Sequence, residues 1–178
     1  MQQRASSFST LVLLTIRELR LERGVHQAFV AQAVGKTPSA WAKIEGGQSP
    51  LSMDAFFAVC GALQLQPSYV MTLVERLVHI FNNHGWFFQS NDLGDEDELL
   101  PLVQSYFASS GYDALKNDPV HRVSLMVVGS VFGPGALPTI VRYCCEQSTK
   151  EWIDNGAKFS TSPAPLNMAT TASAGTLL

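Results

Sequence analysis

Helix-start and helix-end signals divide one stretch of the first half of the chain into two short helices joined by a tight turn. The first helix begins near His26 and ends at Gly35. Thr37 and Pro38 then place a capping residue before a proline at the first helical position, a pair that favours a new helix. That second helix ends at Gly46. The sequence therefore predicts two short helices joined by a turn of a few residues.

Apolar spacing predicts further helices on both sides of this pair. One runs from about Ser9 to Arg23, Ser52 can cap a fourth, and Pro67 opens a fifth that extends through Phe81. The fourth is expected to turn its apolar residues inward: Met53, Phe56, Phe57, Cys60 and Leu63. Residues 1–70 therefore predict a five-helix domain.

The second half also has a helical pattern. One helical stripe consists of Leu99, Leu102, Val103, Tyr106 and Phe107. Asp118-Pro119 repeats the cap-and-proline start, followed by a stripe of Val120, Val123, Val127 and Val131 that closes at Gly133. Pro138 starts a last helix with Ile140, Val141 and Cys144 on one side. We therefore predict an all-α chain, with a helical region over 71–159 and a disordered tail over 160–178.

The spacing of individual residues resembles the lambda-repressor-like helix-turn-helix family (Cro-type, XRE) over about residues 10–70. The residues that carry the resemblance are Ile16, Leu19, Arg20, Gln27, Ala31, Gly35, Thr37, Ile44, Glu45, Gly47 and Pro50. Small residues and turn glycines match as well as apolar ones. The resemblance implies that the motif over 27–46 binds double-stranded DNA, with its second helix in the major groove.

The resemblance also implies the roles of single residues. The DNA-binding surface would consist of Gln27, Lys36, Thr37, Pro38, Ser39, Ala40, Lys43 and Gln48. Gln27 would hold a phosphate at the start of its helix. Arg20 and Glu45 would pair to fix the angle of the reading helix without touching DNA.

Some positions depart from the family pattern. Pro38 replaces a polar reader and Ala40 cannot donate a hydrogen bond, so direct readout is expected to rest on Ser39, Lys43 and apolar contact with thymine methyl groups. Gln64 replaces the glycine that usually ends the fourth helix, at a cost of about 1 kcal/mol.

The two halves of the chain differ in net charge. The whole chain has 12 basic and 15 acidic residues. Residues 1–70 have six basic against four acidic ones, and the remainder has six against eleven. Only the first half is therefore suited to face a polyanion.

A stripe on the fifth helix predicts a homodimer. Val70, Leu73, Leu77 and Ile80 follow a 3-4-3 spacing that is typical of helix pairing. A cyclic dimer implies a pseudo-palindromic operator. Residues 71–159 would supply dimerisation and a site for a regulatory protein or small effector.

Other kinds of chemistry find little support. Three cysteines form no disulfide framework and fit a reducing cytoplasm. The histidines lack metal-ligand spacing, and no nucleophile motif is present, so we expect no metal, no cofactor and no catalytic residue. The uncharged run from Val123 to Val141 is interrupted by glycines and prolines, which argues against a membrane span.

The preferred interpretation is therefore a bacterial or phage-like transcriptional repressor. One alternative is an antitoxin-type autoregulator whose C-terminal region binds a partner protein. Another is an adaptor that uses the same five-helix domain to dock proteins and binds no DNA.

Overall fold

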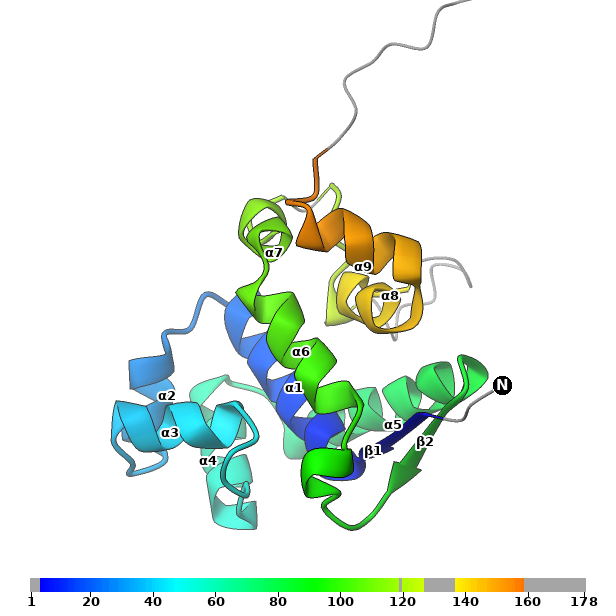
Figure 1. Cartoon of the computed structure of the whole chain (residues 1–178). Helices are drawn as coiled ribbons and strands as arrows, with labels where there is room; N and C mark the ends of the chain where they lie inside the picture. Colours follow the sequence, from blue (N-terminus) through cyan, green and yellow to red (C-terminus); the bar gives the residue numbers. More distant parts are fainter. Residues whose placement is uncertain (1–3, 119, 127–136, 159–178) are drawn as a thin grey trace, which may run out of the picture.

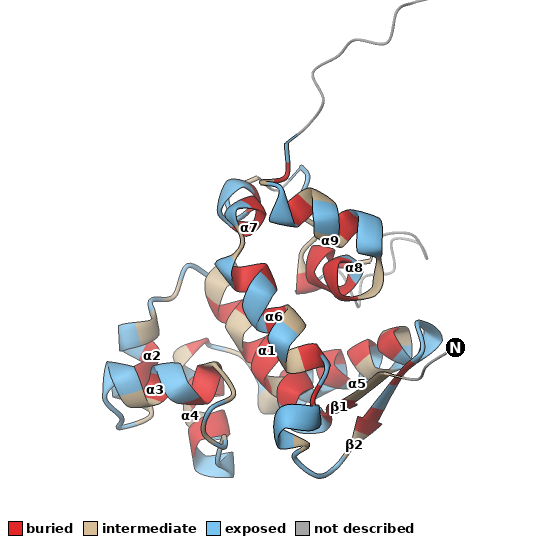
Figure 2. Cartoon of the chain, in the orientation of Figure 1, coloured by how far each residue is buried: buried red, intermediate tan, exposed pale blue. Residues whose placement is uncertain are grey.

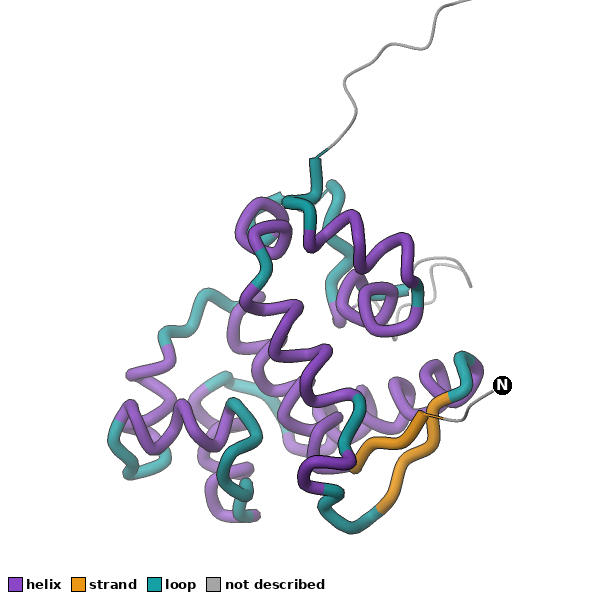
Figure 3. Tube along the Cα trace, in the orientation of Figure 1, coloured by secondary structure: helices purple, strands orange, loops and turns teal. Residues whose placement is uncertain are grey.

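The computed structural model describes residues 4–118, 120–126 and 137–158. Helices dominate these residues, as Figures 1 and 3 show, and the prediction of an all-α chain is confirmed. In chain order the helices are α1 (Phe8–Glu22), α2 (Gln27–Ala33), α3 (Pro38–Glu45), α4 (Met53–Ala62), α5 (Pro67–Asn83), α6 (Leu99–Ala108), α7 (Ser110–Leu115), α8 (Thr139–Cys145) and α9 (Gln147–Asp154).

The predicted helix starts in the first half are confirmed. The Thr37 hydroxyl accepts a hydrogen bond from the backbone N–H of Ala40 at 3.2 Å, and Pro38 follows at the first helical position. Ser52 caps α4 in the same way, accepting from the N–H of Ala55 at 3.2 Å. Each cap satisfies a backbone donor that the first turn of a helix leaves free.

Two helix ends show what the left-handed backbone conformation requires. Gly35, after α2, has φ +64, and no other atom lies within 4 Å of where a Cβ would stand. Glycine is therefore needed there for its backbone alone. Gln64 adopts φ +53 after α4, which confirms that it takes the place of a glycine.

α1 is the central element of the fold. It packs along α5 on one side and contacts α6 on another, as Figure 1 shows. Figure 2 shows that its surface is mostly buried. Its buried apolar residues are Leu11, Leu13, Leu14, Ile16 and Leu19. A single apolar core runs from α1 into both halves of the chain, and the boundary predicted at residue 70 falls inside α5.

The stripe predicted for dimerisation is covered within one chain. Val70 and Leu73 are 1% exposed, Leu77 is fully buried, and only Ile80 is partly exposed. These side chains belong to the same core as α1. The assignment of Val70, Leu73 and Leu77 to a subunit contact is therefore wrong, because α1 already occupies the face on which they lie.

A short parallel strand pair was not predicted. β1 (Arg4–Ser7) pairs with β2 (Trp86–Gln89), so the start of the chain lies beside the segment after α5. The Trp86 and Phe88 rings contact Phe81 of α5 edge-on. Strands of four residues are too short to give a clear alternating pattern.

The C-terminal region differs from the prediction at one helix start. Asp118 caps a turn, accepting hydrogen bonds from the N–H groups of Val120 and His121, and residues 120–124 are not helical. The rest of that predicted stripe, and the tail over 160–178, lie outside the described residues. The helix after Pro138 is confirmed as α8, and a further helix, α9, follows it.

Candidate nucleic-acid interface

The helix pair α2 and α3 is held by apolar side chains on its inner side. Val30 and Ala31 of α2 are fully buried, as is Trp41 of α3, and Ile44 is 4% exposed. Ala31 leaves room for the two helices to approach closely, since a larger side chain there would force them apart. The inner side thereby fixes which side of α3 faces outward.

The outward side of α3 brings most of the predicted DNA-binding residues together. Thr37, Pro38, Ser39 and Lys43 are exposed, and Ala40 is partly exposed. A shallow hollow lies on this side, lined by Lys36, Thr37, Ser39, Ala40, Lys43, Ile44, Ser49 and Pro50. Pro38 and Gln48 are exposed but do not line the hollow.

The positive charge of this surface comes from two lysines. Neither Lys36 nor Lys43 forms an ion pair within the described part of the chain. Other basic residues of the first half are used inside the fold. Arg17 lies over the Phe107 ring, and Arg23 donates to the carbonyl of Leu63 at 2.9 Å.

The predicted pair of Arg20 and Glu45 is confirmed. Arg20 Nε and Nη2 donate to the two carboxylate oxygens of Glu45 at 2.6 and 2.9 Å, and both residues are buried. A two-point contact of this kind fixes direction as well as distance. It holds the end of α3 against α1.

Gln27 belongs to the same cluster, which was not predicted. Its Nε2 donates to Glu45 at 2.8 Å, while the residue stays partly exposed. An amide nitrogen has two hydrogens, so one is left for a phosphate. The sequence placed Gln27 at the start of α2 but gave no signal for this third contact.

Sequence patterns also did not predict a buried charged cluster on the other side of α1. Glu18 is fully buried and lies 2.6 Å from Arg122, whose guanidinium also approaches Glu22 at 3.9 Å. Burial raises the pKa of Glu18 to about 7, against the attraction of Arg122. The two partners are over a hundred positions apart, so sequence spacing could not have found them.

The adjacent cysteines are structural. Cys144 is buried and Cys145 partly buried. Burial raises the pKa of both thiols, to about 11 for Cys145. Thiols held in this protonated form are poor nucleophiles. Cys144 thus serves as a small hydrophobic residue of the core.

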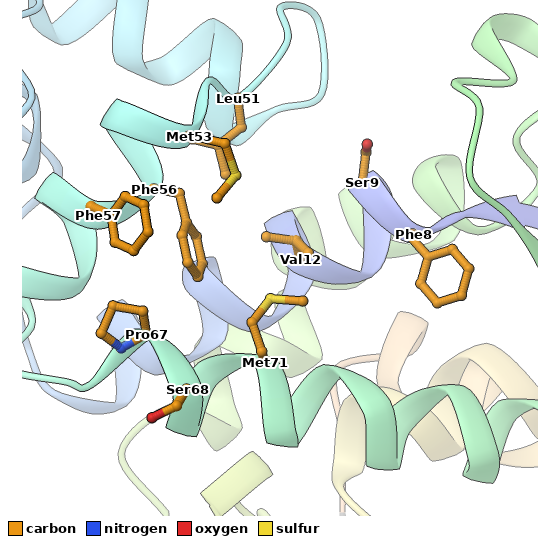
Figure 4. Close-up of a pocket in the computed structure, with 10 residues that line it drawn as sticks. All are labelled: Phe8, Ser9, Val12, Leu51, Met53, Phe56, Phe57, Pro67, Ser68 and Met71. Carbon is orange, nitrogen blue, oxygen red and sulfur yellow. The ribbon is translucent and has the colours of Figure 1, made fainter.

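An apolar groove lies between α1, α4 and α5 (Figure 4). Met53 and Phe57, which were expected to face inward, line it and are 65% and 53% exposed. Phe8 and Met71 are further exposed apolar residues of the groove, at 41% each. The inward assignment of Met53 and Phe57 is therefore wrong, because α4 buries its opposite side, Ala55, Phe56, Val59 and Cys60, mainly against α2 and α5.

Within the described ranges, no single helix is long and apolar enough to cross a membrane. Only α4 and α5 taken together meet that length and composition, and a bend of 106° separates them. The described residues also contain no group of three His, Cys, Asp or Glu side chains that could hold a metal ion.

Comparison with known proteins gives one match. Residues 14–70 match the sequence model of a helix-turn-helix domain. The matched segment runs from the middle of α1 into α5 and contains the whole α2–α3 pair. No curated protein and no solved structure matches the chain significantly.

Proposed function

We propose that this chain, whose residues 14–70 form a helix-turn-helix domain of the lambda-repressor-like type, is a sequence-specific transcriptional regulator. The observation that carries the proposal is the hollow on the outward side of α3, with two unpaired lysines and exposed hydroxyls. Such a surface suits the major groove of a DNA duplex, where hydroxyl and ammonium groups can reach base edges and the flanking phosphates.

Each exposed residue then has a role. α3 lies in the major groove, where Ser39 and Lys43 contact base edges and Ala40 contacts thymine methyl groups. Thr37 and Gln27, at the starts of their helices, face phosphates. Lys36 and Gln48 flank the groove and add backbone contacts. The chain acts as a cytoplasmic repressor that occupies its promoter, and no residue is assigned a catalytic role.

Binding to DNA as a dimer needs a surface other than the buried stripe of α5. The apolar groove of Phe8, Met53, Phe57 and Met71 is the surface we assign to a second copy of this chain. Phe8 and Phe57 are the aromatic residues of this surface, and at about half exposure they offer roughly 150–250 Å² per copy, to which the two methionines add. A standard interface buries about 800 Å² per partner, so surface around the groove would supply the rest. Among the described residues, no ionisable side chain lines the groove, so like charges there would not oppose the contact.

The test is selection of duplexes from a random DNA pool, followed by affinity measurements over a range of salt concentrations. Lys36, the lysine assigned to the DNA backbone, predicts that log K falls with log salt at a slope of about −1 for one copy and about −2 for a dimer. Recovery of a pseudo-palindromic duplex with such a slope supports the proposal. Failure to retain any duplex at low salt would contradict it and favour the adaptor.

A further inference from the structure

We propose that α6, which lies outside the matched domain, holds the C-terminal end of α3 through Gln104 and Leu100 and thereby sets how α3 meets DNA. The inference rests on the proposed function, in which α3 is the reading helix. It makes Gln104 a positioning residue for DNA recognition, although it lies 59 positions beyond the end of α3, Glu45.

The contact is made at the point where α3 ends. Gln104 Nε2 donates to the carbonyl oxygen of Gly46 at 2.8 Å, and Gly46 is the residue that closes the helix. Carbonyls at a helix end have no partner inside the helix, so a side chain that reaches one holds the end in place.

Leu100 makes the second contact, one turn earlier in α6. A Cβ at Gly47 would stand 2.7 Å from Leu100 Cδ1, so the leucine side chain lies directly against the Gly47 backbone. Leu100 and Gln104 are four residues apart and therefore share one face of α6. That face presents an apolar and a polar contact to the same end of α3.

α6 itself is fixed to α1 at its beginning. Asp97, which is 4% exposed, accepts hydrogen bonds from the hydroxyls of Ser6 and Thr10 at 2.8 and 2.7 Å. It also accepts from the first backbone N–H groups of α6, those of Leu99 and Leu100, at 3.0 and 2.9 Å. Asp97 therefore both favours the start of α6 and ties the helix to β1 and α1.

The other end of α6 is fixed as well. The Arg17 guanidinium lies 4.2 Å from the centre of the Phe107 ring, a cation–π contact between α1 and α6. With both ends held by α1, α6 cannot shift without disturbing the core. Leu100 and Gln104 therefore meet α3 from a rigid support.

The loop after α3 lies between α6 and the outward side of α3, which is the proposed DNA-facing surface. Ser49 and Pro50 line the hollow on the outward side of α3. The same two residues line a second hollow, whose other side is formed partly by Leu100. The loop thus separates the reading surface from α6, and a change in α6 would alter both Gly46 and that loop.

The test uses Gln104→Met in the full chain, because methionine keeps the length and neutral charge of glutamine but cannot donate. Affinity is measured for a duplex selected by the wild-type protein and for its scrambled version at one salt concentration. Loss of one hydrogen bond predicts a three- to tenfold loss, roughly, on the selected duplex and a smaller loss on the scrambled one. Amide hydrogen exchange over residues 43–48, without DNA, should become faster.

Gln147→Met is the matched control, since it removes an exposed glutamine contact within α9, from Gln147 Nε2 to Glu151 at 2.8 Å. It should change neither measurement. Unchanged exchange over 43–48 in Gln104→Met, or equal losses on both duplexes, overturns the inference. If the wild-type protein selects no duplex, the proposed function is overturned instead. The hydrogen-exchange comparison then tests only whether Gln104 holds the end of α3.

Discussion

At the scale of single residues, the proposed function divides the outward side of α3 into side chains that would read sequence and side chains that would hold the DNA backbone. Ser39 and Lys43 are four residues apart and exposed on the same side. Thr37 instead caps the helix with its hydroxyl. The difference predicts two kinds of DNA-binding defect.

The variants Ser39→Ala and Lys43→Ala should relax preference at particular base pairs, by about 1–3 kcal/mol each. Thr37→Ala should weaken binding to all sequences alike, because phosphate contacts carry no sequence information. The measurement is affinity for a selected and a scrambled duplex at one fixed salt concentration. Equal losses on both duplexes for Ser39→Ala and Lys43→Ala would mean that α3 is not the specific reader.

Glu45→Ala should lower both stability and DNA affinity. It would leave the buried Arg20 guanidinium without its partner, a change that typically costs about 3–5 kcal/mol. Thermal unfolding and duplex binding are measured together. Glu75→Ala, on an exposed position of α5, is the control and should stay within about 0.5 kcal/mol of wild type. Weaker binding with unchanged stability would contradict a structural role for the pair.

At the scale of elements, substitutions at two helix ends should change stability in opposite directions. Gln64→Gly should stabilise the chain by about 1 kcal/mol, because glycine adopts the left-handed conformation without strain. Gly35→Ala should destabilise it by a similar amount, since no neighbouring atom blocks the added methyl group. For a chain of this size each change corresponds to roughly 2–4 °C in melting temperature. Shifts in the same direction would rule out this explanation.

The contact between Glu18 of α1 and Arg122 should make the stability of the chain depend on pH. The raised pKa of Glu18 means that the folded chain binds this proton more tightly than the unfolded chain does. The Glu18 contribution to the free energy of unfolding is thus present below its ordinary value of 4.5 and falls as pH rises to about 7.

Glu18→Gln removes that titration while keeping an acceptor for Arg122. Relative to wild type, the variant should gain stability between about pH 5 and about pH 8, by on the order of 1–3 kcal/mol. Denaturant unfolding at several pH values measures the difference. A difference that stays constant over this range would contradict the assignment.

At the scale of the whole molecule, the proposed dimer predicts that the groove forms the subunit contact. Phe57→Glu should convert the dimer to a monomer at micromolar concentration without lowering the melting temperature of the monomer, because the side chain is 53% exposed. Analytical ultracentrifugation measures this. Val120→Glu, at a position that is 82% exposed and outside the groove, should leave the dimer intact. A wild-type monomer that binds DNA with full affinity would refute the dimer.

The sequence by itself determined the helices of the first half. The caps at Thr37 and Ser52, the turn at Gly35 and the substitution at Gln64 are local in cause, because each depends on the backbone within a few residues. The pairing of Arg20 with Glu45 came from the resemblance, which supplies the spatial relation between two helices. The side of α3 that faces outward followed from the buried positions of Trp41 and Ile44.

Only the tertiary structure decided which apolar faces are covered. The stripe of α5 was consistent with a subunit contact or a core contact, and α1 makes it core. The contacts of Asp97, Gln104 and Arg122 join segments far apart in the chain, and periodicity carries no information about such pairs. The reason is physical: a helix pattern fixes which side chains share a face, but the partner of that face depends on how all the helices pack together.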